Sequence, residues 1–270
     1  MPEPFGLAAA GGSADPATLA LLAVAALLAG WVDAVVGGGG LIQLPALVIG
    51  LPGAAPAQLL ATNKLGSICG TSVSALTYYR RIGPDLRTAV PMAVAAYLGS
   101  VGGAFVGLHI PKAAFNPIIL VLLIAVGAYT LLKPSLGEVT ALRHSAGRHT
   151  SYAVLVGLAI GCYDGALGPG TGSFLVFALV GLLGYAFLEA SALAKIANFA
   201  TNLGALTVFV PHGEVIWTVG LWLGVMNLLG GYLGARSALR LGSGFVRSVF
   251  VVVVSAFTVR IGGALVGFWS

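Results

Sequence analysis

The sequence predicts an all-α polytopic membrane protein made of two inverted-topology repeats. Three observations support this fold class: an apolar composition, hydrophobic stretches long enough to cross a bilayer, and an internal similarity between residues 17–133 and residues 151–270. Each repeat is expected to contain a broken helical hairpin followed by three transmembrane helices. This arrangement gives about eight helices in all, or up to about ten when half-helices are counted separately.

The composition excludes an ordinary soluble domain. Hydrophobic residues make up 58% of the 270 residues and charged residues only 8%, whereas soluble domains are about 25% charged. Most hydrophobic stretches run for about 18 to 25 residues between short polar segments, the length that a helix needs to cross the hydrocarbon core. The chain is therefore expected to cross the lipid bilayer several times.

A shift of 131 residues aligns the two halves of the chain. Under this shift Asp33 aligns with Asp164, and Lys64 aligns with Lys195. Charged residues are so scarce in these segments that matching acidic and basic positions indicate a repeat. Several glycines match in the same way: Gly30, Gly37, Gly39, Gly99 and Gly103 align with Gly161, Gly168, Gly170, Gly230 and Gly234.

The first repeat follows an N-terminal tail, residues 1–16, and is expected to hold helical stretches at 17–36, 40–51, 56–81, 87–108 and 114–132. The glycines at 37–40 end the first stretch because they interrupt the helical pattern. Pro56 lies at the expected start of the third stretch, where proline is tolerated since the first N–H groups of a helix have no intrahelical partner.

The second repeat follows a polar linker, residues 134–150, and gives the same order of elements. Its stretches are expected at 152–166, 172–184, 187–209, 214–235 and 246–268. The segment GALGPGTGS, residues 165–173, takes the place of the four glycines of the first repeat. Each repeat therefore begins with two apolar stretches joined by a Gly-rich break.

The charges of the loops predict the orientation in the membrane. Short cytoplasmic loops are enriched in Lys and Arg, and the basic residues fall in three groups: Arg80, Arg81 and Arg87; Lys133, Arg143 and Arg148; and Arg236, Arg240 and Arg247. The loop at 211–214 and both termini lack Lys and Arg and are expected to be extracytoplasmic, with Lys112 as the exception. This assignment requires an odd number of crossings per repeat, so the two repeats have opposite orientations.

The two Gly-rich breaks are candidate binding surfaces. Irregular backbone at membrane depth is tolerated only where it is buried in protein or lines a watery cavity. A half-helix that begins at such a break presents N–H groups and the positive end of its dipole to an anion. The residues predicted to do so are Gly38, Gly39, Gly40, Gly170, Thr171 and Gly172. The alternative is that the glycines only permit tight turns or close helix packing, which better explains Gly99 and Gly103.

Two lysines are predicted to complete an oxyanion site. Lys64 and Lys195 each lie about eight residues into a spanning stretch, roughly 12 Å deep at the rise of an α-helix. Helical spacing places polar side chains on the same faces or beside them: Asn63, Ser67 and Thr71 with Lys64, and Asn198 and Asn202 with Lys195. Ionisable residues inside a membrane are usually functional. The alternative is that each lysine only neutralises a buried Asp33 or Asp164.

The roles of Asp33 and Asp164 stay open at this point. They can carry a coupling proton, hold the lysines, or bond to backbone N–H groups and brace the breaks, and a bracing or pairing role is favoured. Arg260 has no counterpart in the first repeat, and its role is open as well.

Other site types are not expected. The four histidines fall in loops without ligand spacing, and the two cysteines lie in apolar segments, so no metal site, cofactor or catalytic residue is predicted. The net charge of +5 is explained by loops that set orientation, so no nucleic-acid partner is expected. The expected partners are a small anion and the bilayer, with a coupling proton or ion and a homo-oligomeric state left open.

Two quoted segments carry a family resemblance. GWVDAVVGGGGLIQLPALVIGLPGAAPAQLLATNKLGS, with the later GCYDGALGPGTGSF, resembles the sulfite exporter TauE/SafE family, also called the toluene sulfonate uptake permease family. The likeness covers nearly the whole chain and implies a cytoplasmic-membrane transporter of sulfite, thiosulfate or organosulfonates with two related halves. The second half departs from the pattern because LAKIANFATN replaces ATNKLGSICG, so the implied site is asymmetric.

The predicted function is secondary transport of small sulfur-containing anions by alternating access between the inverted repeats. The alternatives are a passive anion channel that uses the same groups, or a transporter of another small organic anion. An intramembrane enzyme with Ser67 or Ser173 as nucleophile is disfavoured because no histidine base lies nearby at membrane depth. A scaffold without transport activity is disfavoured because paired buried charges are costly.

Overall fold

A computed structural model describes residues 16–111, 113, 140–143 and 145–265, and within these ranges every regular element is a helix. The first half contains α1 (Pro16–Val36), α2 (Gly40–Gly50), α3 (Pro56–Ile82) and α4 (Leu86–Gly107). The second half contains α6 (Ala146–Ala166), α7 (Thr171–Ala178) with a π-helical turn η1 (Leu179–Leu183), α8 (Phe187–Phe209) and α9 (Trp217–Leu265). The tail 1–16, except Pro16, the helix predicted at 114–132 and the linker before residue 140 lie outside the described residues.

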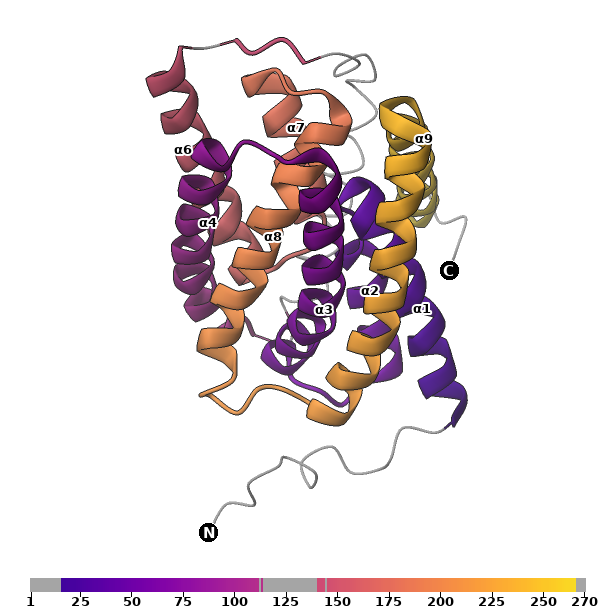
Figure 1. Ribbon diagram of the computed structural model, residues 1–270. Helices are drawn as coiled ribbons and strands as arrows, with labels where there is room; N and C mark the ends of the chain where they lie inside the picture. Colours follow the sequence, from indigo (N-terminus) through magenta and orange to yellow (C-terminus); the bar gives the residue numbers. More distant parts are fainter. Residues whose placement is uncertain (1–15, 112, 114–139, 144, 266–270) are drawn as a thin grey trace.

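The all-α membrane fold class is confirmed. Among the described residues four helices are long and apolar enough to cross a membrane: α1, α4, α8 and the part of α9 from Trp217 to Val246. Helix α3 has 27 residues but carries Lys64 in its first half and two arginines in its last turn. The chain is therefore a multi-pass membrane protein whose bundle is shown in Figure 1.

Local sequence signals fix the ends of the first helices. Pro56 occupies the first turn of α3, and the Gln58 side chain accepts a hydrogen bond from the N–H of Ala55 at 3.0 Å. Helix α3 ends at Gly83, whose φ of 61° is favourable only for glycine. The Asp85 carboxylate then caps α4 by accepting from the N–H of Arg87 at 3.0 Å. These ends agree with the predicted bounds to within about one residue.

The prediction of a loop between 235 and 246 is wrong. Helix α9 continues through this segment and is interrupted only at Gly242, where φ is 77° and ψ is −173°. Arg236 and Arg240 are exposed side chains on the helix instead of loop residues. The physical reason is that arginine is a good helix former, and a reversal of direction needs only one glycine with positive φ.

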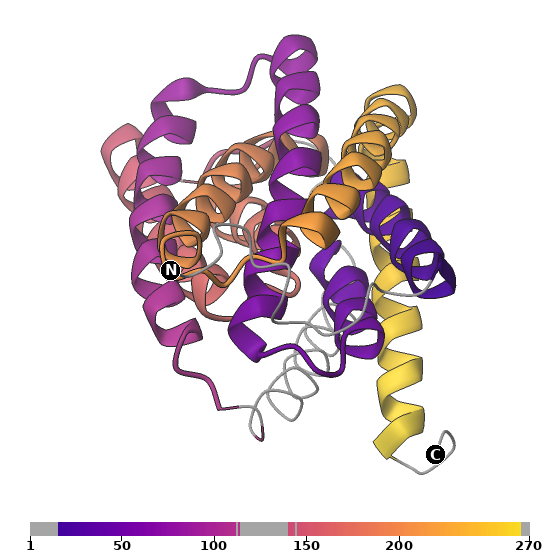
Figure 2. The same cartoon turned by 90° about the horizontal axis from the view of Figure 1, so that it is seen from below.

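Helices pair closely along two stripes of glycine. On α9, Gly230 and Gly234 pack against the backbone of α1 at Leu27 and Trp31, so closely that a Cβ on either would overlap a carbonyl oxygen. Helix α4 packs in the same way on α6. Glycine at such positions lets backbones approach to contact distance. Figures 1 and 2 show the α1/α9 pair and the α4/α6 pair on opposite sides of α3 and α8.

The two pairs of helices are related by the 131-residue shift. On α4, Gly99 and Gly103 meet the carbonyl oxygens of Leu158 and Cys162, each of which lies 131 residues beyond its counterpart in the α1/α9 pair. The first helix of each predicted repeat thus packs against the fourth helix of the other. In both pairs, the residue numbers of the contacting positions increase in the same direction along the two helices. The helices within each pair therefore run parallel.

The exposed arginines gather at one end of the bundle. They are Arg80, Arg81, Arg87, Arg143, Arg148, Arg236 and Arg240. The segments that carry them include the turn between α3 and α4 and the start of α6, which lie at the upper end in Figure 1. The loop between α8 and α9 lies at the opposite end and, in the described residues 210–216, contains no lysine or arginine.

Candidate functional site

The two Gly-rich breaks meet at the centre of the bundle. The N–H of Ser173 donates to the carbonyl of Gly37 at 3.1 Å, and the Ser173 hydroxyl donates to the carbonyl of Val36 at 2.9 Å. A Cβ on Gly37 would overlap the backbone of Gly172, and the φ of Gly37 is 82°. Glycine is therefore required there both for its conformation and for the close contact of the two breaks.

The contact between the breaks brings two helix N-termini together. Helix α2 starts at Gly40 and α7 starts at Thr171, and Gly40 packs against the backbone of Gly168 and Pro169. The positive ends of both helix dipoles therefore face the same small region. Some of the donors expected here are already used, because the N–H groups of Leu41 and Ile42 donate to Gly38 and Gly39 at 3.0 Å.

Each buried lysine forms an ion pair with the aspartate of the other repeat. The Nζ of Lys64 lies 2.6 Å from Oδ2 of Asp164, and the Nζ of Lys195 lies 2.8 Å from Oδ2 of Asp33. The 131-residue shift converts one pair into the other. Both lysine side chains are at most 2% exposed. The structure thus shows the pairing that the sequence left as one of several roles for the two aspartates.

The two carboxylates differ in their surroundings. Oδ1 of Asp164 accepts a hydrogen bond from the Thr171 hydroxyl at 2.5 Å, so this carboxylate braces the start of α7 as well as pairing with Lys64. The matching position in the first repeat is Gly40, which has no hydroxyl. The Asp33 side chain is 14% exposed, compared with 2% for Asp164. The site is therefore asymmetric, as the departures in sequence between the two halves predict.

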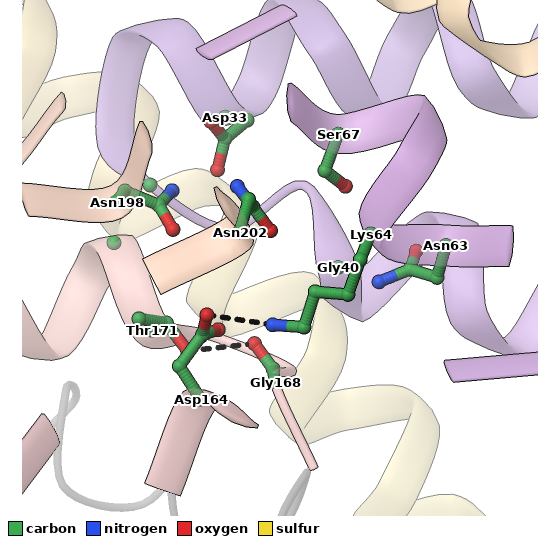
Figure 3. A pocket seen from close by; sticks show the side chains of 12 residues that line it. Asp33, Gly40, Asn63, Lys64, Ser67, Asp164, Gly168, Thr171, Asn198 and Asn202 are labelled. Atoms are coloured by element: carbon green, nitrogen blue, oxygen red, sulfur yellow. Dashed lines mark hydrogen bonds and ion pairs between the residues drawn. The ribbon is translucent and has the colours of Figure 1, made fainter. Parts of the chain in front are cut away.

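A small polar cavity of about 20 Å³ lies between the two breaks (Figure 3). This volume has room for about one ordered water molecule. Five helices supply polar side chains to it: α1 and α6 from near their ends, α7 from its first residue, and α3 and α8 from their interiors. The lining residues are Asp33, Gly37, Gly40, Asn63, Lys64, Ser67, Asp164, Gly168, Thr171, Gly172, Asn198 and Asn202.

Most of the predicted site residues line this cavity, and the rest lie close behind it. Lys195 reaches the lining through its bond to Asp33. Thr71 accepts a hydrogen bond from Nδ2 of Asn202 at 3.4 Å. The predicted residues Gly38, Gly39 and Gly170 belong to the breaks but not to the cavity wall, which instead includes Gly37 and Gly168. Gly37 and Gly168 were predicted as matching positions of the repeat but not as site residues.

Two buried amides were missed by the sequence reasoning. Nδ2 of Asn227 donates to Oε1 of Gln43 at 2.6 Å, and Nε2 of Gln43 donates to the carbonyl of Asn63 at 3.3 Å. This chain joins α9, α2 and α3 directly behind the cavity. Both amides interrupt apolar stretches in the sequence, and polar residues at membrane depth are the signal that could have identified them.

Two tyrosines fasten the breaks to their neighbours. The Tyr163 hydroxyl donates to the carbonyl of Pro169 at 2.6 Å, and the Tyr78 hydroxyl donates to the carbonyl of Ala34 at 2.9 Å. Buried carbonyls near a helix end need such partners because an unpaired polar group in an apolar environment is costly. These bonds help to hold the irregular backbone in place at membrane depth.

The charges around the cavity sum to zero. Lys64 and Lys195 contribute two positive charges, and Asp33 and Asp164 contribute two negative ones. Ammonium, amide and hydroxyl donors surround a space between two helix N-termini, which is a chemistry suited to an oxyanion. No group of three or more potential metal ligands occurs among the described His, Cys, Asp and Glu residues.

Comparisons with known proteins identify the family of the chain. The family model described as sulfite exporter TauE/SafE matches residues 22–261. The chain is 39% identical over 244 residues to "Probable membrane transporter protein ORF9" of Sinorhizobium sp, covering 90% of this chain and 92% of that protein. It is 36% identical over 248 residues to "Probable membrane transporter protein YfcA" of Escherichia coli strain K12, covering 92% and 90%.

A third relative, "Probable membrane transporter protein" of Haemophilus influenzae, is 35% identical over 243 residues, which cover 90% of this chain and 93% of that protein. No solved structure gives a significant match. The similarity therefore extends over nearly the full length of each relative.

Proposed function

The chain belongs to the sulfite exporter TauE/SafE family of membrane transporters, and from this premise we propose that it is a secondary transporter of small sulfur-containing anions. The proposed substrates are sulfite, thiosulfate or an organosulfonate. The proposed mechanism is alternating access between two inverted repeats. The activity is movement of the anion across the membrane without chemical change.

One observation carries the proposal: each of two buried lysines forms an ion pair with an aspartate of the other repeat, at the point where two helix N-termini meet. The ion pairs Lys64–Asp164 and Lys195–Asp33 lie beside a cavity with an almost entirely polar wall. A buried ammonium group is costly unless it binds an anion or a carboxylate. Positions near a helix N-terminus add a favourable field for an anion. An oxyanion is therefore the ligand that best fits the donors present.

The arrangement of the half-helices supports alternating access. Helix α2 runs from the cavity toward one end of the bundle, and α7 runs toward the other end (Figure 1). The packing contacts of the two halves follow the 131-residue shift, as expected for repeats that are related by an axis in the membrane plane. In the state described here the cavity has room for only about one water molecule, so it is too small for a sulfur oxyanion. Opening it requires the repeats to move against each other.

The exposed arginines support an orientation for this movement. Their shared end of the bundle would face the cytoplasm under the positive-inside rule. The loop between α8 and α9, with His212 and Glu214 but no lysine or arginine, would face outward. The proposed location is the cytoplasmic membrane.

The function can be tested by flux of ³⁵S-labelled sulfite and thiosulfate in proteoliposomes. We expect saturable uptake that Lys64→Ala and Lys195→Ala each reduce by at least about tenfold, because each change removes a charge-assisted contact in a buried site. The matched control is Arg80→Ala, which removes an exposed basic residue at the end of α3.

Preserved transport in both lysine variants would contradict the assignment of the site. Absence of flux of both anions in the wild type, with either direction of loading, would contradict the proposed function. Flux that does not saturate and appears as single-channel current would instead indicate a passive anion channel.

A further inference from the structure

The groups around the cavity carry as many negative charges as positive ones, which conflicts with binding of an anion. Asp33 and Asp164 both line its wall, and each is already bonded to a lysine. An additional anion would leave the buried site with a net negative charge. Buried charges without compensation are strongly unfavourable and are usually neutralised by a change of protonation.

The ion pairs also occupy the space that an anion needs. The remaining volume is about 20 Å³, enough for about one water molecule, whereas thiosulfate has five heavy atoms. In Figure 3 the ammonium group of Lys64 points at the carboxylate of Asp164 and is in direct contact with it. An anion that contacts the lysine must therefore separate at least one ammonium group from its carboxylate.

We infer that Asp33 and Asp164 are proton-binding sites, and that each anion binds together with as many protons as it carries negative charges. This inference rests on the proposed function, since it concerns the same anion site. A monovalent sulfonate would enter with one proton, and divalent thiosulfate would enter with two. The complete transport step would then move no net charge across the membrane.

The surroundings of the carboxylates determine the order of protonation. Asp33 is 14% exposed and lacks a hydroxyl partner equivalent to Thr171, so a proton can reach it at smaller cost. Asp164 is 2% exposed and held by both Lys64 and Thr171. Asp33 therefore takes the first proton, and a monovalent anion needs no other. Asp164 takes the second proton, which only a divalent anion requires.

Few other titratable groups face these carboxylates. Around Asp33 they are Lys195 from α8, and Lys64 and Tyr78 from α3. Around Asp164 they are Lys64 from α3 and the adjacent Tyr163. Helices α2 and α7, which begin beside them, contain no charged residue. On α9, the described arginines Arg236 and Arg240 have exposed side chains. The two aspartates are thus the carboxylates that line this region.

Calorimetry in buffers with different ionisation enthalpies tests the inference on the purified full chain. Thiosulfate and methanesulfonate are suitable probes because neither changes protonation near neutral pH. We expect uptake of about two protons per bound thiosulfate and about one per bound methanesulfonate. The corresponding affinities should rise about 100-fold and about tenfold for each unit by which the pH falls, within the range where the aspartates titrate.

Conservative variants assign the protons to residues. Asp164→Asn and Asp33→Asn should each reduce the uptake by about one proton with either anion, because each change removes one negative charge that a bound anion would otherwise require to be neutralised. The control is Asp85→Asn, which removes an exposed carboxylate at the cap of α4 and should change neither value. The wild-type measurement stands by itself if a variant fails to fold.

The outcomes separate this inference from the proposed function. Anion binding with no linked proton would overturn the inference and leave the transporter assignment intact. No binding of either probe, together with no flux of sulfite or thiosulfate in proteoliposomes, would overturn the proposed function. In liposomes, accumulation driven by a pH gradient but not by a potassium–valinomycin potential supports electroneutral coupling, and accumulation driven by the potential alone contradicts it.

Discussion

The ion pair between Lys64 and Asp164 should contribute little to stability as a pair but cost much when only one partner is removed. At the observed 2.6 Å and an effective dielectric constant near 20, the attraction is about 6 kcal/mol. Desolvation costs several kcal/mol for each ion, so the two effects nearly cancel. Lys64→Met leaves the Asp164 carboxylate buried without its cation and should reduce the free energy of unfolding by about 3–5 kcal/mol.

The double variant distinguishes this reasoning from simple loss of packing. Asp164→Leu alone should also cost about 3–5 kcal/mol, because it leaves the Lys64 ammonium unpaired. The combination of both changes should lie within about 2 kcal/mol of the wild type, since neither charge then remains buried. Reversible unfolding in mixed micelles with increasing SDS, analysed as a double-mutant cycle, measures these differences.

Additive costs in the cycle would refute the reasoning, because they would mean that the two side chains do not act as a pair. Arg80→Met is the control for loss of a basic residue, and it should change stability by less than about 0.5 kcal/mol because Arg80 is exposed. The equivalent change Lys195→Met should cost less than Lys64→Met, since Asp33 retains contact with solvent.

Two further predictions concern packing and the buried amides. Gly103→Val should abolish correct folding or strongly reduce the yield of monodisperse protein on size-exclusion chromatography, because a Cβ there overlaps the carbonyl of Cys162. The neighbouring Gly102→Val is the control and should be tolerated, since a Cβ at Gly102 meets nothing within 4 Å. Equal yields of the two variants would contradict the packing of α4 on α6. Gln43→Leu should reduce the free energy of unfolding by about 1–3 kcal/mol because it removes two buried hydrogen bonds, from Asn227 to Gln43 and from Gln43 to the carbonyl of Asn63. A change below about 0.5 kcal/mol in the same unfolding assay would show that the amide chain does not stabilise α2.

The sequence was sufficient to predict the helices whose ends carry local signals. Pro56, Gly83 and Asp85 act through the backbone next to them, and the structure places α3 and α4 within about one residue of the predicted bounds. Gly242 shows the limit of this reasoning. A cluster of arginines indicates a polar segment, but an exposed helix can be as polar as a loop. Only the three-dimensional structure shows that the helix continues as far as Gly242.

Most residues of the candidate site were predicted from the sequence, but the ion pairs and hydrogen bonds between its helices were not. Spacing placed Lys64 near Ser67 and Thr71 on one face, because these contacts lie within a single helix. The choice of Asp164 as its partner depends on how the two breaks pack, and no local pattern in the sequence reports that. The bond from Gln43 to Asn227 spans 184 residues. Such contacts are determined by the arrangement of whole helices, which spacing along the chain does not specify.

The crossing of the ion pairs between halves has a consequence for biosynthesis. Asp164, the partner of Lys64, is synthesised 100 residues after it, and Lys195, the partner of Asp33, is synthesised 162 residues after it. At about 5–20 residues per second these intervals last about 5–20 s and about 8–32 s. Throughout them the translocon and the surrounding lipid must accommodate a first half that carries one unpaired acid and one unpaired base. Both permanent pairs can form only after the second half of the chain has been synthesised.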